Sequence, residues 1–112
     1  EDENYFAFLD INPLQKGHTL VIPKKEDDYI FNLDDATYSG LMMTAKKIAA
    51  AIKESTNCKR VGVTVLGMEV PHVHIHLVPM NSEKDMLFSN PKMELSKEEF
   101  EAIAADIAKR VK

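Results

Sequence analysis

The stretch Pro71–Pro79 reads P-H-V-H-I-H-L-V-P and holds three of the four histidines of the chain. The histidines occupy every second position, and aliphatic residues fill the positions between them. Side chains alternate between the two faces of a β-strand. We therefore expect His72, His74 and His76 to share one face of a strand, while the aliphatic residues between them face the core.

A row of three imidazoles permits three interpretations. It can be the polar face of a half-solvated strand, although packing gives no reason to use imidazole three times. It can bind a transition metal, but three residues in line span roughly 13 Å and converge poorly on one ion. In the third interpretation, which we favour, one imidazole attacks phosphorus while an acceptor on its other nitrogen fixes the tautomer. The flanking imidazoles then hold phosphate oxygens and assist the leaving group.

Composition limits the class of protein around this stretch. The chain has 112 residues, a length that suits one domain, and a net charge of −4 argues against a nucleic-acid partner. No apolar run approaches the length of a membrane span, so no membrane partner is expected. The single cysteine, Cys58, favours a reducing, cytoplasmic location. Because the chain starts without Met and a strand-like pattern begins almost at once, we expect N-terminal sequence to be missing.

The remaining patterns predict an α+β fold with an antiparallel sheet and two helices. An amphipathic helix is expected from Asp34 or Asp35 to about Ser55, because its apolar residues Leu41, Ala45, Ile48, Ala49 and Ile52 follow the 3.6-residue period. A capping box at Ser96 opens a last helix whose apolar residues Phe100, Ile103, Ile107 and Val111 share one face. We expect a polar, irregular flap between Asn81 and Pro91. The expected strands are Tyr5–Asp10, His18–Pro23, Arg60–Leu66 and Val70–Val78.

Two blocks of the chain carry a family resemblance. H-V-H-I-H-L-V-P resembles the H-x-H-x-H-x-x motif of the histidine triad, or HIT, family. The block F-L-D-I-N-P-L-Q-K-G-H-T-L-V-I-P-K-K, from Phe8 to Lys25, is similar to the strand–turn–strand block of the same family. The resemblance implies a HIT-like sheet of about five strands with two helices, forming a single domain over residues 1–112.

The resemblance also implies roles for all four histidines. His74 matches the nucleophile, which becomes a covalent nucleotidyl-histidine. His76 matches the residue on the phosphate and the leaving-group side. His72 matches the residue whose main-chain carbonyl orients the nucleophile, and His18 matches a supporting histidine.

Further nucleotide contacts follow from the same resemblance. Asp10 matches an acidic residue that binds the ribose hydroxyls, although it could simply be a turn-forming aspartate before Asn12. Phe8, Leu9 and Ile11 are expected to line the base pocket, with a place in the core as the alternative for Phe8 and Ile11. Backbone N–H groups for the phosphate are expected at Gly67, Glu69 and Val70. Met68 is a departure, because the family usually places a glutamine there and a thioether cannot donate a hydrogen bond.

The expected activity is hydrolysis or transfer at the α-phosphate of a purine nucleotide. The substrate class is a nucleoside phosphoramidate or a dinucleoside polyphosphate, and neither a cofactor nor a metal is expected. The resemblance implies a homodimer whose sheet extends across a two-fold axis. Two rival interpretations are a nucleotide-binding regulatory module with little turnover, motivated by Met68, and a metal-dependent enzyme that uses the histidines as ligands.

Overall fold

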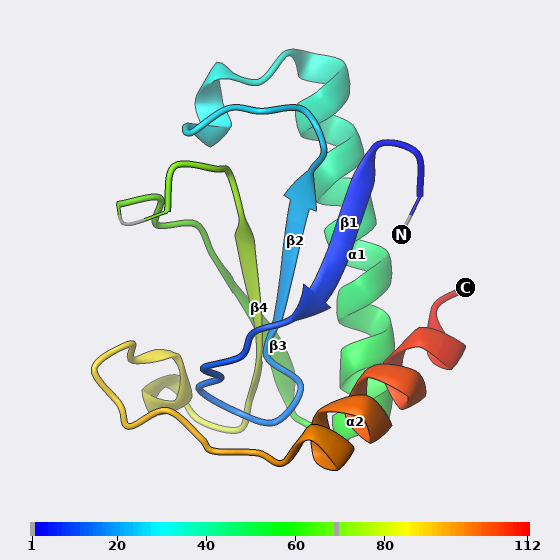
Figure 1. Ribbon diagram of the computed structural model, residues 1–112, viewed down its shortest axis with the longest axis vertical. Helices are drawn as coiled ribbons and strands as arrows, with labels where there is room; N and C mark the ends of the chain where they lie inside the picture. The colour runs from blue at the N-terminus through cyan, green and yellow to red at the C-terminus, as the bar shows by residue number, and fades with distance from the viewer. Residues whose placement is uncertain (1, 69) are drawn as a thin grey trace.

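The structure is a computed structural model that describes residues 2–68 and 70–112. Figure 1 shows a sheet with a long helix and a shorter C-terminal helix on one side of it. The elements, in chain order, are β1 (Tyr5–Leu9), β2 (Thr19–Pro23), the 3₁₀ helix η1 (Ile30–Asn32), α1 (Asp35–Thr56), β3 (Arg60–Thr64), β4 (Ile75–Met80), the 3₁₀ helix η2 (Glu83–Met86) and α2 (Lys97–Arg110).

The sheet confirms the predicted α+β class with antiparallel pairing throughout. Its strand order is β1-β2-β4-β3, so β2 and β4 are the central strands. The expected count of about five strands is one too many for the described residues, which contribute four. The four strands are those that the sequence patterns predicted, and the other described segments carry helical periodicity or polar, turn-forming residues.

The predicted strand Val70–Val78 is wrong at its beginning, because β4 starts only at Ile75. Pro71 has no backbone N–H to donate to a ladder. The N–H of His72 donates to the carbonyl of Val70 over 2.9 Å, which forms a turn, and that of Val73 donates to Asp27 over 2.8 Å. The first two histidines of the motif therefore precede the strand, although the alternation of buried and less buried residues continues through them.

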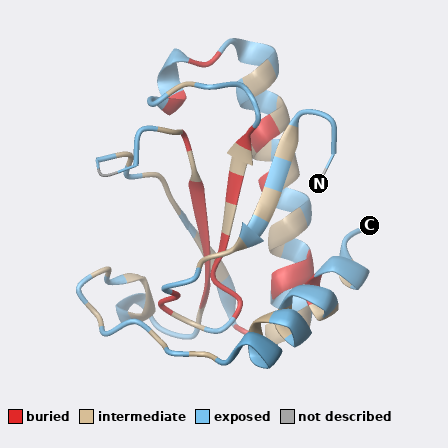
Figure 2. Cartoon of the chain, viewed as in Figure 1, coloured by how far each residue is buried: buried red, intermediate tan, exposed pale blue. Residues whose placement is uncertain are grey.

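Helix α1 confirms the predicted amphipathic helix and packs on one face of the sheet. Asp34 is its N-cap and accepts a hydrogen bond from the Thr37 N–H, and Asn57 ends it in the left-handed conformation. The buried residues Leu41, Ala45 and Ile52 belong to one core cluster with strand residues. Figure 2 shows burial concentrated on β2, β4 and parts of α1.

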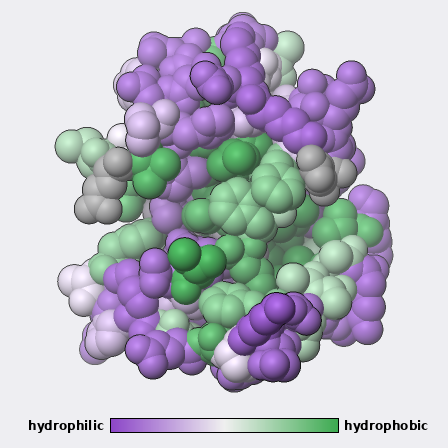
Figure 3. Space-filling model, viewed as in Figure 1, coloured by the Kyte–Doolittle hydropathy of each residue, from purple (hydrophilic) through white to green (hydrophobic). Residues whose placement is uncertain are grey.

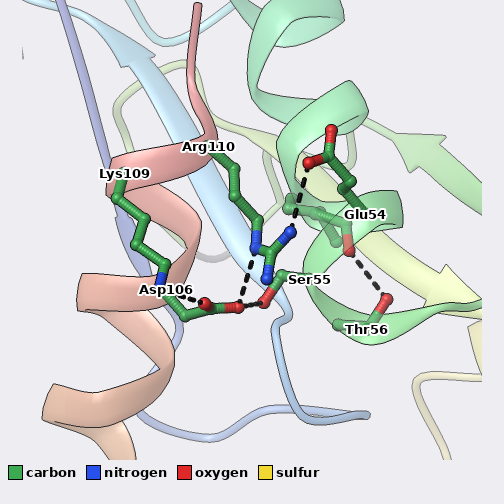
Figure 4. A network of polar contacts seen from close by, with 7 residues as sticks. Glu54, Ser55, Thr56, Asp106, Lys109 and Arg110 are labelled. Carbon is green, nitrogen blue, oxygen red and sulfur yellow. Dashed lines mark hydrogen bonds and ion pairs between the residues drawn. The ribbon is translucent and has the colours of Figure 1, made fainter.

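Helix α2 begins at the predicted capping box, where Ser96 and Glu99 bond each other's backbone N–H groups. Its predicted apolar face places Ile107 in the core, whereas Val111 caps the helix and is 37% exposed. Polar contacts join α2 to α1, as Figure 4 shows. Asp106 accepts hydrogen bonds from Ser55 and Arg110, and Arg110 also bonds Glu54 over 3.1 Å. Among the described residues, no helix is long and apolar enough to cross a membrane.

Candidate active site

Side chains of β1, β2 and β4 form the face of the sheet opposite α1, because side chains alternate between the two faces along each strand. Thr19 and Val21 are buried on the core side of β2, so His18, Leu20 and Ile22 lie on the other face. Leu20 pairs with Phe8 on β1 and with His76 on β4, which sets these three residues in one row across the sheet. Figure 3 shows apolar side chains gathered at the centre of the molecule in this view.

A cavity of about 740 Å³ opens over this face. Its lining combines apolar residues, the three histidines of the motif, one carboxylate and one ammonium group. The lining residues are Phe8, Asp10, Asn12, Leu20, Ile22, Leu66, Gly67, Met68, Val70, His72, His74, His76, Phe88 and Lys92.

His74 is held in one tautomer by the backbone next to it. Its Nδ1 lies 2.8 Å from the carbonyl oxygen of His72. A carbonyl only accepts hydrogen bonds, so Nδ1 carries the proton and Nε2 keeps its lone pair. His74 lines the cavity and is only partly buried. The geometry therefore offers the cavity an imidazole nitrogen able to act as a nucleophile.

His72 is fixed in a similar way by the end of β2. Its Nε2 lies 2.8 Å from the carbonyl oxygen of Pro23 and donates the hydrogen bond. This bond holds the side chain of His72, while its main-chain oxygen holds His74. The side chain of His72 therefore bonds to β2, and its main-chain carbonyl orients His74.

His18 and His76 form a buried pair with a single direction of hydrogen bonding. The backbone N–H of Leu14 donates to Nδ1 of His18 over 3.0 Å, so the proton of neutral His18 is on Nε2. That Nε2 lies 3.0 Å from Nδ1 of His76 and donates to it. The remaining proton of neutral His76 is consequently on Nε2. His76 also lines the cavity.

Burial keeps both members of this pair neutral. Burial, together with the nearby His18 and His74 and against the effect of Asp10, lowers the pKa of His76 to about 4. Burial also lowers the pKa of His18, with Lys92 acting in the same direction and Asp10 against it. Desolvation disfavours the charged imidazolium. At neutral pH His76 is therefore a hydrogen-bond donor rather than a cation.

Asp10 forms a turn contact and also lines the cavity. One carboxylate oxygen accepts a hydrogen bond from the Asn12 N–H over 2.8 Å, as a turn-forming aspartate does. The other oxygen lies 3.6 Å from Nε2 of His18, and the residue lines the cavity. The carboxylate thus retains lone pairs that could accept hydroxyl groups of a ligand.

The remaining predicted contacts divide between the cavity and other surroundings. Phe8, Gly67 and Val70 line the cavity, and Gly67 has the positive φ of 70° that its predicted turn requires. Leu9 instead packs against the core cluster, and Ile11 is 79% exposed outside the cavity lining. Glu69 lies outside the described residues. Met68 lines the rim and is 90% exposed.

Several lining residues were absent from the sequence prediction. Leu20 and Ile22 could have been found, because they follow His18 with a period of two on the same strand. Phe88 and Lys92 carry no comparable signal, since they lie in the segment that the sequence marked only as irregular or just beyond it. That segment contains η2, and Phe88 within it lines the cavity.

One group of potential metal ligands occurs among the described residues. Asp10, His18 and His76 each offer a ligand atom, and these atoms lie within 4.8 Å of one another. However, metal coordination through Nε2 of His18 would leave the proton of a neutral ring on Nδ1, directed at the N–H of Leu14. Two donors would then face each other in a buried place. The donor set therefore suits a hydrogen bond better than a metal ion.

Comparisons with known proteins place this architecture in a family. The HIT domain model matches residues 1–83, and the chain belongs to the HIT domain family. Adenosine 5′-monophosphoramidase hnt1 of Schizosaccharomyces pombe is 34% identical over 108 residues, covering 95% of this chain and 81% of that protein.

A second relative and a solved structure agree with the family. The asymmetrical bis(5′-nucleosyl)-tetraphosphatase of Schizosaccharomyces pombe is 30% identical over 92 residues, covering 74% of this chain and 50% of that protein. A hypothetical histidine triad nucleotide-binding protein of Sulfolobus tokodaii superposes with a TM-score of 0.82 at 29% identity, covering 99% of this chain and 80% of the other. The names of these two enzymes support placing the chain in the class of nucleotide hydrolases.

Proposed function

We propose that the protein releases a nucleoside monophosphate from its leaving group through a covalent nucleotidyl-histidine on His74. The observation that carries the proposal is the bond from Nδ1 of His74 to the His72 carbonyl, which leaves the Nε2 lone pair available at the cavity. The names of the two yeast relatives support a phosphoramidate or a dinucleoside polyphosphate as the substrate.

The chemistry proceeds in two balanced steps. In the first, the Nε2 lone pair of His74 forms a bond to the α-phosphorus, and the bond from phosphorus to the leaving group breaks. Nε2–H of His76 donates a hydrogen bond to the departing atom and keeps its proton, while the leaving group departs as a nucleotide anion or, from a phosphoramidate, as an amine whose nitrogen takes a proton from water. In the second step, a water oxygen bonds to the phosphorus, the bond to His74 breaks, and the proton that this water loses passes to the solvent. The monophosphate leaves and His74 regains its starting state.

The nucleoside is assigned to the remainder of the cavity. The flat apolar surface of Phe8, Leu20 and Ile22 suits a purine base. Asp10 accepts the ribose hydroxyls with its available lone pairs. Backbone N–H groups near Gly67 and Val70 hold the phosphate oxygens. Neither step uses a metal ion, so activity is expected to persist in the presence of a chelator.

A homodimer is part of the proposal. Strand β3 lies at the edge of the sheet, where its backbone can pair with a second copy. Val63 on this strand is 52% exposed, which gives the edge an apolar side chain to cover. The molar mass in solution, measured by light scattering, tests this: a monomer at micromolar concentrations would contradict it.

The mechanism is tested by the mass of the intact protein after brief mixing with adenosine 5′-phosphoramidate, quenched without acid because phosphoramidates at histidine are acid-labile. We expect an adenylyl adduct on the parent protein and none on His74→Ala. His72→Ala is the matched control, since it keeps the carbonyl that holds His74.

A second candidate function is a nucleotide-binding module with little turnover, favoured by Met68 at the rim of the cavity. Bound nucleotide without an adduct and without monophosphate release, on both substrate classes, would establish this candidate instead.

A further inference from the structure

The segment of residues 84–93, here called the strap, contributes Phe88 and Lys92 to the lining of the cavity. It follows the residues that match the HIT domain model, which end at residue 83. Asn90 donates from its side chain to the Lys84 carbonyl over 2.6 Å, and Lys92 donates to the Asn90 carbonyl over 3.0 Å and to that of Phe88. The strap is therefore internally cross-linked by hydrogen bonds.

The end of the strap is attached to the turn between β1 and β2. The backbone N–H of Met93 donates to the carbonyl of Pro13 over 2.8 Å. The next residue of that turn, Leu14, supplies the N–H that fixes the tautomer of His18. The strap and the histidine pair thus bond to adjacent residues of the same turn.

Phe88 brings the aromatic ring of the strap onto the histidine pair. Its centroid lies 4.9 Å from that of His76 with the planes at 76°, and 6.2 Å from that of His18 at 79°. Both are edge-to-face contacts, a favourable arrangement of aromatic rings. His18 is 1% exposed and His76 is 7% exposed although both lie on the open face of the sheet. The ring of Phe88 is one of the groups that exclude water there.

We propose that Phe88 is a positioning residue, which keeps the His18–His76 hydrogen bond dry and thereby presents Nε2–H of His76 to the substrate. This rests on the proposed function, in which that N–H donates a hydrogen bond to the leaving group. Water reaching the pair could replace the donor at Nδ1 of His76 and stabilise other protonation states. A dry site makes the existing hydrogen bond stronger and charge less favourable.

Other groups around His76 do not provide the same constraint. Asp10 favours a charged imidazole, whereas His18, His74 and Lys92 oppose charge on the pair. None of these effects selects which of the two nitrogens of neutral His76 carries the proton, apart from the hydrogen bond from His18. Protection of that bond is therefore the means by which a residue of the strap influences the chemistry.

The test is nitrogen-15 NMR of the imidazoles in the full chain, which reports the protonated nitrogen of each histidine across pH. The parent should show His76 protonated on Nε2. Proton NOE spectra of the same sample should show cross-peaks between the rings of His76 and Phe88. In Phe88→Ala we expect a mixture of His76 tautomers and a pKa of His76 raised by about one unit or more toward its ordinary value. Phe88→Leu, which keeps an apolar cover, should restore most of the parent pattern.

Leu87→Ala is the matched control, because Leu87 neighbours Phe88 on the strap but is 51% exposed and is not part of the cavity lining. It should leave the His76 signals unchanged. A His76 tautomer and titration unaltered in Phe88→Ala would overturn the proposal. So would the absence of Phe88–His76 cross-peaks in the parent, a measurement that does not depend on folding of any variant.

Kinetics separate this proposal from the proposed function. If the parent turns over nucleotide, Phe88→Ala should lower kcat about 10-fold with little change in KM, since only the hydrogen bond to the leaving group is affected. If the parent forms no adduct, the proposed function fails. The NMR result then still decides whether Phe88 controls the protonation of His76.

Discussion

Nε2 of His18 lies 3.0 Å from Nδ1 of His76, although 58 positions separate the two residues in the sequence. The Leu14 N–H on the other side of His18 gives this hydrogen bond its direction. Together with the bonds from His74 and His72 to backbone carbonyls, it fixes a tautomer for each of the four histidines. Their backbone partners, rather than the imidazoles alone, define the chemistry of the site.

The buried pair makes stability depend on pH in a defined window. The pKa of His76 is lowered from 6.5 to about 4, so below pH 6.5 the unfolded chain binds more protons than the folded one. The contribution of neutral His76 to the free energy of unfolding should be fully present above pH 6.5. It should fall by about 3 kcal/mol as the pH drops to about 4. His18, whose pKa is also lowered, adds to the loss.

Urea unfolding at pH 7.5, 6.5, 5.5 and 4.5 measures this loss. Asp106 and Glu99 also have lowered pKa values, but their contributions are lost only as the pH falls through their ordinary values of 3.8 and 4.5. The range from pH 7.5 to 5.5 therefore reports mainly on the histidines. His76→Gln serves as the control and should flatten the pH dependence. An unchanged slope in that variant would contradict the assignment.

His72→Ala should preserve the reactivity of His74, contrary to what three equivalent histidines would suggest. The hydrogen bond to His74 comes from the main-chain carbonyl of residue 72, which alanine retains. The cost is the side-chain bond to the Pro23 carbonyl, about 1 kcal/mol of stability. We expect kcat to stay within about 10-fold of the parent. Steady-state kinetics decide: loss as complete as in His74→Ala would show that the His72 side chain itself is required.

Asp10→Asn should weaken binding of the nucleoside without disturbing the turn. The amide oxygen can still accept from the Asn12 N–H, but the charge and one acceptor for the ribose hydroxyls are lost. KM should rise about 10-fold or more for a ribonucleotide, with a smaller change in kcat. A 2′,3′-dideoxy substrate is the control, and it should bind parent and variant about equally. An equal penalty on both substrates would remove the ribose from the interpretation.

Gly40→Ala should destabilise the protein even though alanine favours helices. Gly40 lies within α1, where an added Cβ would overlap the hydroxyl and ring of Tyr5. That hydroxyl donates to the Thr37 carbonyl over 3.1 Å, so moving it breaks a bond. We expect a loss of about 1–3 kcal/mol on the basis of overpacking.

The same change made in a Tyr5→Ala background tests the cause of that loss. There the steric overlap is absent, and Gly40→Ala should stabilise the protein by about 1 kcal/mol through helix propensity. Thermal or urea unfolding of the four variants completes the cycle. A loss of equal size in both backgrounds would mean that Tyr5 is not responsible.

Local patterns in the sequence predicted the strands and helices and marked the candidate site residues. Alternation predicted the strands around His18 and His76, and the 3.6-residue period predicted α1 with its face of Leu41, Ala45 and Ile52. The motif marked the histidines before any contact between them was known. Such features depend on neighbours along the chain, so the chain itself reveals them.

Tertiary structure alone decided how the histidines are held and what covers them. Strand β4 begins at Ile75, later than the sequence predicted, because the N–H of Val73 bonds to a loop instead of to a neighbouring strand. The tautomer of His18 depends on the N–H of Leu14 in a turn, and the burial of His76 depends on Phe88 from the strap. The direction of a hydrogen bond and the exclusion of water depend on contacts between segments far apart in the sequence. The strand and helix periods of the sequence therefore do not predict them.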